Sequence, residues 1–96
     1  MYVLVTYDVD TTTDVGKKRL RRVSSACKDY GQRVQNSVFE CMVTDAQLCL
    51  LKERIKEIID TACDSIRIYH LSKSSHGRVE VMGKETAFNI EDALIV

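Results

Sequence analysis

The sequence contains no proline and only four glycines among its 96 residues, and it has no long hydrophobic run. Because disordered segments are rich in proline and glycine, these low counts favour a folded chain. The ~20 consecutive apolar residues of a membrane-spanning helix are missing, so no membrane partner is expected. The length fits a single domain over residues 1–96 with an adequate but thin core, and such small domains often gain stability as dimers.

The cysteines lack any recognisable motif. Cys27, Cys41, Cys49 and Cys63 include no pair with the two-residue spacing of a zinc knuckle or a redox motif. Three of them fit apolar positions of expected elements, which indicates small buried side chains in a reducing compartment. The N-terminus has no basic leader, and Asp8 interrupts its short apolar run, so we expect a cytoplasmic protein without a secretory signal.

Several catalytic signatures are also missing. The sequence has no Gly-rich phosphate loop, no nucleophile elbow and no cluster of metal-ligand residues. His70 falls on an expected strand and is interpreted as a packed core residue, whereas His76 falls in a polar loop. A nuclease that uses histidine as its base is therefore the weaker hypothesis.

Positive charge is concentrated in one part of the chain. Lysine and arginine total 14, as do aspartate and glutamate, so the net charge gives no hint of a polyanionic partner. Residues 14–33, however, carry a local charge of +5. Local fields steer charged partners, so this window is a candidate nucleic-acid surface. The candidate residues are Lys17, Lys18, Arg19, Arg21, Arg22 and Arg33.

The same window has the periodicity of a helix over residues 14–30. Its apolar residues are spaced three and four apart and form one stripe, with Gly31 as the expected C-terminal stop. The cations on the opposite side are of the kind that contact phosphates without reading sequence. The alternative is an ordinary solvated face, but such faces usually mix charges of both signs.

The first ten residues predict a short strand that ends at acidic residues. Val3, Val5 and Tyr7 alternate with a second face that carries Leu4 and Asp8. A carboxylate on a half-buried face needs a partner or a cation, so Asp8 is a candidate Mg²⁺ ligand at the strand end.

One aspartate per chain makes a weak metal site. A symmetric dimer that packs sheet face on sheet face would bring two copies of Asp8 together, and the ion could then activate water against a phosphodiester. The alternative is that Asp8 only caps the turn through Thr11 or Thr12. Asp10 is interpreted as a turn residue, and Asp14 as the start of the helix, with a supporting role in metal binding as the alternative for either.

The remaining pattern predicts an α+β fold with two helices on one face of a sheet. Residues 33–43 read as one long strand, followed by a capping box at residues 44–47, a second helix, and strands at residues 65–71 and 78–82. This gives the order β-α-β-α-β-β plus an apolar tail at residues 93–96. The order β-α-β-β-α-β requires a break at residues 35–37, which spacing alone does not force. A second copy is the simplest cover for the other sheet face, and the tail could add a strand to its edge.

Four segments together resemble the CRISPR-associated protein 2 family, in its type I-C branch. They are VLVTYDV, KKRLRRV, YGQRVQNSVFEC at residues 30–41 and DSIRIYHL at residues 64–71, and the third is highly specific. The resemblance implies a ferredoxin-like β-α-β-β-α-β sandwich. It also implies an additional C-terminal strand that crosses to the other protomer of a homodimer packed through the sheet faces.

The family's aspartate at the end of strand one corresponds to Asp8, which the resemblance makes the catalytic Mg²⁺ ligand at the dimer axis. The resemblance also implies a metal-dependent endonuclease acting on RNA or double-stranded DNA. It further implies a central dimer between the integrase dimers of CRISPR-associated protein 1 during spacer acquisition. Two hypotheses follow, a Mg²⁺-dependent phosphodiesterase and a non-catalytic DNA-binding scaffold. A third, a small-molecule regulatory domain, is disfavoured by the basic helix.

Overall fold

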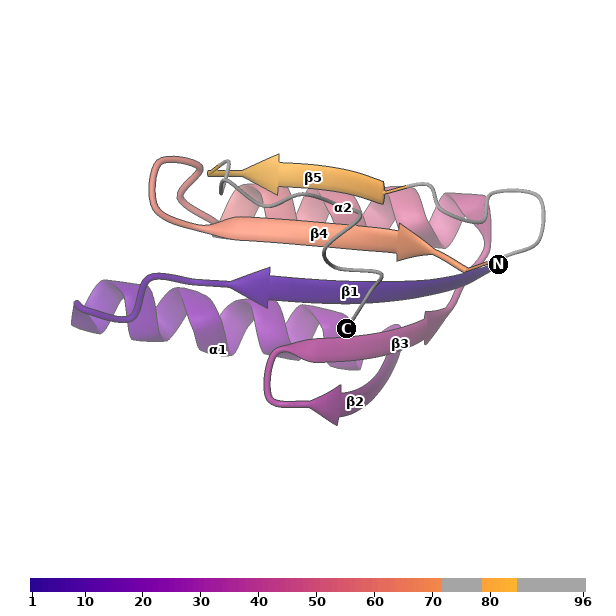
Figure 1. Ribbon diagram of the computed structural model, residues 1–96, viewed down its shortest axis with the longest axis horizontal. Coiled ribbons are helices and arrows are strands. Elements are labelled where there is room, and N and C mark those ends of the chain that lie inside the picture. The colour runs from indigo at the N-terminus through magenta and orange to yellow at the C-terminus, as the bar shows by residue number, and fades with distance from the viewer. Residues whose placement is uncertain (72–78, 85–96) are drawn as a thin grey trace, which may run out of the picture.

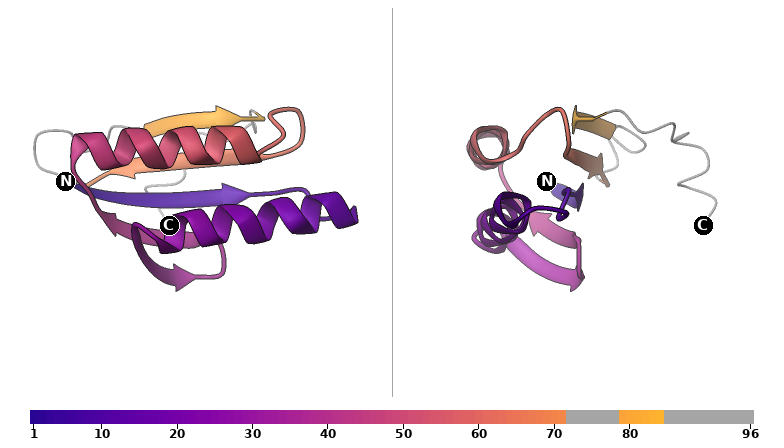
Figure 2. Two further views of the ribbon diagram at one scale, coloured as in Figure 1. Left: turned by 180° about the vertical axis from the view of Figure 1, so that it is seen from behind. Right: turned by 90° about the vertical axis from the view of Figure 1, so that its left-hand side faces the viewer.

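The computed structural model describes residues 1–71 and 79–84 as an antiparallel sheet with two helices on one face (Figures 1 and 2). The strand order across the sheet is β2-β3-β1-β4-β5. The tail at residues 93–96 and His76 lie outside the described residues. The elements are β1 (Tyr2–Asp8), α1 (Asp14–Lys28), β2 (Gly31–Gln35), β3 (Val38–Met42), α2 (Asp45–Ile58), β4 (Ser65–His70) and β5 (Val79–Gly83).

This order confirms the α+β prediction and the β-α-β-β-α-β arrangement, with β5 as an additional strand that pairs with β4 of its own chain. A C-terminal strand that crosses to another protomer stays a prediction. The central strand is β1, which pairs antiparallel with β3 on one side and with β4 on the other. Val3, Val5 and Tyr7 of β1 are buried, as their alternation predicts, because this side of the strand faces the helices.

The prediction of one long strand over residues 33–43 is wrong. Asn36 and Ser37 form a turn between β2 and β3, and the register of the pair shifts between Arg33 and Gln35. Contacts with the end of β1 hold this turn in place. The Tyr7 hydroxyl donates to the Asn36 carbonyl at 3.1 Å, and the Tyr7 amide donates to the Ser37 carbonyl at 3.1 Å. Contacts with β1 therefore accompany a turn within residues 33–43, where the local sequence pattern alone favours one continuous strand.

Side-chain caps define the start of both helices. Thr13 accepts a hydrogen bond from the Gly16 amide at the N-terminus of α1. The predicted capping box of α2 is present, because Thr44 accepts from the Gln47 amide and the Gln47 side chain accepts from the Thr44 amide. These local signals set the start of each helix correctly.

Gly31 does not end α1, which differs from our expectation. The helix ends at Lys28, and Gly31 is the first residue of β2, opposite Cys41. A Cβ at this position would lie 2.2 Å from the Glu40 carbonyl oxygen and 2.5 Å from the Cys41 sulfur. Glycine is therefore required here for close packing of the two strands rather than for a left-handed turn.

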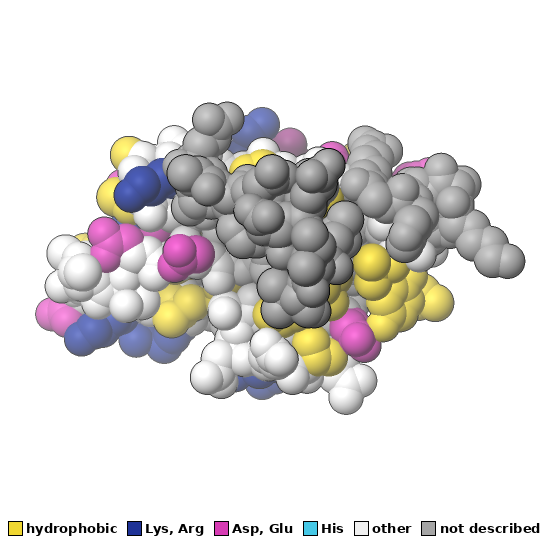
Figure 3. All heavy atoms as spheres, viewed as in Figure 1, with side chains coloured by type: hydrophobic (Ala, Val, Ile, Leu, Met, Phe, Trp, Pro, Cys, Tyr) yellow, Lys and Arg dark blue, Asp and Glu magenta, His cyan; other side chains and the backbone are white. Residues whose placement is uncertain are grey.

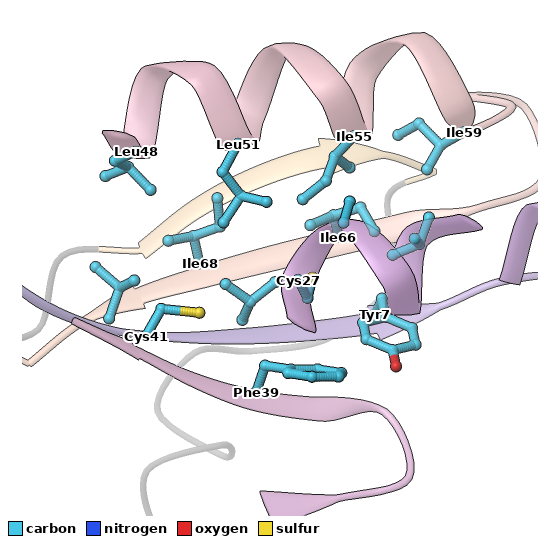
Figure 4. Packing of buried hydrophobic residues seen from close by; sticks show 14 of the residues in the cluster. Tyr7, Cys27, Phe39, Cys41, Leu48, Leu51, Ile55, Ile59, Ile66 and Ile68 are labelled. Atoms are coloured by element: carbon cyan, nitrogen blue, oxygen red, sulfur yellow. The ribbon is translucent and has the colours of Figure 1, made fainter. Parts of the chain in front are cut away.

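The core lies between the sheet and the helices (Figure 4). Side chains from α1, α2 and the three inner strands meet there, and the Tyr7 and Phe39 rings stack with their centroids 6.1 Å apart. Burial raises the pKa of the Cys27 thiol to about 12, so this cysteine is an inert core residue. Cys41 is buried too, but Cys63 is only partly buried and Cys49 is exposed, so two cysteines are buried rather than the three expected. The core packs against one face of β1, and β3 and β4 flank its two edges, so together they determine where its last residue, Asp8, lies.

Candidate functional site

Asp8 is the last residue of β1, opposite Ser65 of β4. Because Tyr7 points into the core, the Asp8 side chain points to the sheet face that no helix covers. We expected it to be half-buried, but it is exposed. No ion pair joins it to another residue within 1–71 or 79–84. Its carboxylate oxygens are therefore accessible to a cation.

The alternative role of Asp8, capping the following turn, belongs to Asp10 instead. The Asp10 carboxylate accepts hydrogen bonds from the Thr12 amide at 2.9 Å and the Thr12 hydroxyl at 2.7 Å. The amide hydrogen bond is the main reason why the pKa of Asp10 lies below its ordinary value. Asp10 is thus a turn residue, as predicted, and Asp14 lies in the first turn of α1.

A single copy of the chain does not form a metal site on its own in the part that the structure describes. No three histidine, cysteine, aspartate or glutamate side chains lie together there. Carboxylate oxygen is nevertheless the ligand that Mg²⁺ prefers, and the ion commonly takes only one or two protein carboxylates. The Asp8 carboxylate is therefore a donor of the kind that fits Mg²⁺.

The sequence interpretation overlooked Asp64, a carboxylate that is completely buried beside this site. It follows α2 and directly precedes Ser65, the residue that pairs with Asp8. Its oxygens accept hydrogen bonds from the Asp10 amide at 3.0 Å, the Asp60 amide at 2.9 Å and the Arg19 guanidinium at 2.8 Å. Asp64 therefore ties together the segments that follow β1 and α2, and it fixes the end of β1.

These hydrogen-bond donors offset the unfavourable effect of burying the Asp64 carboxylate. Burial raises the pKa of this carboxyl, but the hydrogen bonds from Asp60, Arg19 and Asp10 outweigh burial and hold the pKa below its ordinary value. The only sequence signal was an aspartate immediately before the apolar strand at residues 65–71. Its partners are distant in the sequence, so the spacing of residues gave no sign of them.

The ion pair with Asp64 holds the Arg19 side chain in a mostly buried position. Its side chain is only 15% exposed, and its guanidinium contacts a carboxylate with no exposure. The hydrogen bond to Asp64 raises the pKa of Arg19. Arg19 is therefore engaged in a structural contact, unlike the other predicted cations of α1.

The remaining cations of α1 lie on two sides of the helix. Lys17, Lys18, Arg21 and Arg22 are all exposed. Arg21 lines a cleft beside β2 and the turn that follows it, whereas Arg22 lines a second cleft beside Arg54 of α2. Figure 3, which views the helix-free sheet face, shows basic side chains at its lower left margin, where α1 extends past β1 in Figure 1. The basic surface thus belongs to the helix layer.

Arg33 lies on the same side as Arg21, although it comes from β2. Its guanidinium lies 5.4 Å from the centroid of the Phe39 ring and donates a hydrogen bond to the Ser24 hydroxyl of α1. The structure therefore brings two predicted cations, Arg21 and Arg33, to one cleft.

His70 is a buried core residue, as predicted. One of its ring nitrogens lies 2.6 Å from a carboxylate oxygen of Glu80 on β5, and Lys52 of α2 contacts the other oxygen at 2.6 Å. Because the ring is only 3% exposed and faces the helix layer, it is not positioned to act on an external phosphate.

The helix-free sheet face carries exposed apolar side chains. Met42 is 71% exposed, and Leu71 and Val81 are 43% and 45% exposed. Met42 pairs with Tyr2, Val81 pairs with Arg67, and Leu71 directly follows the buried His70, so all three share the face that bears Asp8. Yellow hydrophobic patches are visible on this face in Figure 3.

Together these features define a small antiparallel α+β domain with a basic helix layer and an accessible aspartate at the end of its central strand. The model of the family described as CRISPR associated protein Cas2 matches residues 1–79. The chain therefore belongs to the Cas2 family. The type I-C branch stays a prediction. No helix among the described residues is long and apolar enough to cross a bilayer.

Named relatives agree with this assignment. The chain is 47% identical over 96 residues to CRISPR-associated endoribonuclease Cas2 1 of Moorella thermoacetica, and the match covers 100% of both. It is 50% identical over 95 residues to CRISPR-associated endonuclease Cas2 of Halalkalibacterium halodurans, covering 99% of both. The structure of Streptococcus pyogenes Cas2 at pH 6.5 matches with a TM-score of 0.72 and 62% identity, over 76% of this chain and 88% of that one. The predicted class, a CRISPR-associated nuclease, agrees with the names of these relatives.

Proposed function

We propose that the protein is a homodimeric, Mg²⁺-dependent endonuclease that hydrolyses phosphodiester bonds of double-stranded DNA or RNA in CRISPR adaptation. The observation that carries the proposal is the exposed Asp8 carboxylate at the end of the central strand, on the face that no helix covers. The names of its relatives, endonuclease and endoribonuclease, support the reaction class. We place the protein in the cytoplasm, where the buried Cys27 and Cys41 remain reduced.

Formation of a dimer would complete the proposed metal site. A second copy packed on the helix-free face would cover the exposed Met42, Leu71 and Val81 side chains, which gives the association a hydrophobic driving force. A two-fold axis near the end of β1 would place the two Asp8 carboxylates opposite each other. Each protomer would then contribute one carboxylate to a shared site.

The chemistry follows from this arrangement. When bound, Mg²⁺ supplies a Lewis acid for the scissile phosphate and lowers the pKa of a bound water. The two Asp8 carboxylates would hold the ion through their oxygens. Asp64, through the Asp10 amide, keeps the end of β1 in place. Exposed Lys17, Lys18 and Arg21 would attract the phosphate backbone to the protein.

The proposal is tested by replacing the carboxylate. We expect Asp8→Ala to lower cleavage of duplex DNA and RNA in Mg²⁺ by at least about 100-fold, because the shared site loses its protein ligands. A chelator should have the same effect on the wild type. Asp10→Ala is the matched control, because Asp10 lies two residues away and engages Thr12. Equal cleavage by the wild type and Asp8→Ala would end the catalytic proposal.

Duplex binding is tested separately by reversing charge on α1. Arg21→Glu with Arg22→Glu should weaken duplex affinity about tenfold or more at low salt and flatten its salt dependence, because fewer counterions are released. Lys56→Glu, at an exposed position of α2, is the control that changes net charge elsewhere. Unchanged affinity in the double variant would exclude α1 as the docking surface.

A second candidate function is that of a non-catalytic scaffold that binds duplex DNA and the integrase CRISPR-associated protein 1. One observation favours it: the basic helix layer and the Asp8 face lie on opposite sides of the sheet (Figure 2), so DNA binding does not require the carboxylate. In this case Asp8→Ala would retain the dimer, duplex binding and spacer acquisition. Loss of acquisition in a folded, dimeric Asp8→Ala variant would favour the nuclease.

A further inference from the structure

A cleft of ≈ 540 Å³ lies between α1 and the β2–β3 hairpin, on the helix side of the sheet. Figure 2 shows these two segments side by side. Three cations line the cleft, Arg21 and Lys28 from α1 and Arg33 from β2. The described residues that line it include no aspartate or glutamate. The cleft therefore has a concentrated positive charge that no lining carboxylate offsets.

Arg33 is oriented before any ligand arrives. Its guanidinium stacks over the Phe39 ring at 5.4 Å from the ring centroid, and it donates to the Ser24 hydroxyl. A guanidinium has five N–H donors, so most remain available to an anion. A side chain that is already ordered loses less conformational entropy on binding, which favours affinity. Planar guanidinium groups also match the oxygens of a phosphate.

The charge and shape of the cleft indicate its ligand class. A phosphate monoester carries a charge of roughly −1.5 to −2 near neutral pH, whereas each diester of a strand interior carries about −1. Three unopposed cations suit the more highly charged group. The volume exceeds that of a phosphate alone and lies within the range of small-molecule sites. Leu20 and Asn36 also line the cleft, where the sugar and the base attached to the phosphate would lie.

We propose that this cleft binds the terminal phosphate monoester of a nucleotide, either at the end of a nucleic-acid strand or as a free mononucleotide. A duplex interior fits less well, because its bases are stacked inward and cannot fill the apolar part of the cleft. One consequence rests on the proposed function. Hydrolysis of a phosphodiester by water breaks one P–O bond and leaves an alcohol on one end and a phosphate monoester on the other. The cleft is then suited to retain a newly cleaved end.

The test compares two short single strands that differ only in a terminal phosphate. Fluorescence anisotropy would measure the affinity of a labelled ten-nucleotide thymidine strand with and without a 5′-phosphate, in chelator so that nothing is cleaved. The same comparison is made for a 3′-phosphate. We expect the phosphorylated strand to bind about tenfold tighter, as one or two charge-assisted hydrogen bonds provide. Adenosine monophosphate as a competitor distinguishes a free nucleotide from a strand end: displacement supports the former and its absence the latter.

Single substitutions test whether the preference for the phosphorylated strand arises in this cleft. Arg33→Ala should remove the preference for the phosphorylated strand, and Lys28→Ala provides a second, exposed position on α1 if the first variant folds poorly. Arg22→Ala is the matched control, because it lines the other cleft and should weaken both strands by the same factor. Equal affinity of the wild type for both strands, or a preference that survives both variants, would overturn the proposal. The Asp8→Ala variant should keep the preference, so a failed nuclease proposal leaves this result intact.

Discussion

Two aspartates at the junction of β1 and β4 differ completely in their surroundings. Asp8 ends β1 and pairs with Ser65, and Asp64 directly precedes that serine. Asp64 has no exposure, and its carboxylate accepts hydrogen bonds from Asp10, Asp60 and Arg19. Asp8 is exposed and has no ion-pair partner in the described part of the chain. A buried carboxylate with its donors in place is structural, whereas an accessible one without a cation beside it is available for a ligand.

The comparison also explains how the two residues cooperate. Asp64 accepts from the amide of Asp10, two residues after Asp8, and its own carbonyl accepts from the Lys84 amide at 2.7 Å. The buried residue thus connects the chain after β1 with the chain after β5. Such support would keep the Asp8 carboxylate within the small range of positions that the proposed metal site requires.

The largest expected effect is on stability, from removal of the buried carboxylate. Asp64→Ala should lower the free energy of unfolding by about 3–5 kcal/mol, because it leaves two backbone amides and the Arg19 guanidinium without their acceptor. Urea denaturation measures the change. Arg19→Ala should cost less, because the two amide donors to Asp64 remain. A loss below about 1 kcal/mol for Asp64→Ala would contradict the structural assignment.

A smaller loss is expected from the glycine that lies over this junction. Gly83 has φ +91°, and a Cβ there would lie 2.0 Å from the Asp64 carbonyl oxygen. Gly83→Ala should therefore lower the free energy of unfolding by about 1–3 kcal/mol, because alanine is strained in this conformation. Thermal unfolding with circular dichroism would detect it. A change within about 0.5 kcal/mol would mean that the junction tolerates a shift of β5.

The free energy of unfolding should depend on pH differently in the wild type and in a variant with a neutral side chain at position 64. Because its hydrogen bonds outweigh burial and lower its pKa on folding, Asp64 stabilises the protein fully above its unfolded pKa of ~3.9. This stabilisation is lost as the pH falls through the lower pKa of the folded state. Urea unfolding at a series of pH values should show a smaller decline below pH ~4 for Asp64→Asn than for the wild type. Equal slopes would show that the pKa of Asp64 does not change on folding.

The smallest expected effect is on the stability of the Asp8 variant. Asp8→Asn should change the free energy of unfolding by less than about 0.5 kcal/mol in chelator, because the side chain is exposed. Urea denaturation beside Asp64→Asn makes the comparison direct. A loss of about 2 kcal/mol or more in Asp8→Asn would assign Asp8 a structural role and weaken its assignment to Mg²⁺.

Much of the fold could be predicted from local patterns. The alternation of Val3, Val5 and Tyr7 identified the buried face of β1, and residues 44–47 identified the start of α2. The turn at Asn36 could not be predicted, because contacts with Tyr7, 29 residues away, hold it. The resemblance to a family supplied the correct β-α-β-β-α-β order where spacing left two orders open.

The candidate site was predicted less completely. Asp8 and the cations of α1 were identified from their positions along a strand and a helix. The separation of Arg21 and Arg22 into two clefts could not be foreseen, because it depends on how α1 packs between the β2–β3 hairpin and α2. The same packing places Arg33 beside Arg21.

The sequence by itself determined the alternation of β1, the helix caps, the cluster of positive charge and the presence of Asp8 at a strand end. These features depend on residues within a few positions of one another. Only the tertiary structure decided that Arg19 pairs with Asp64, 45 residues away, and that Asp8 stays accessible. The physical reason is that backbone periodicity is local, whereas burial and ion pairing depend on which segments the folded core brings together.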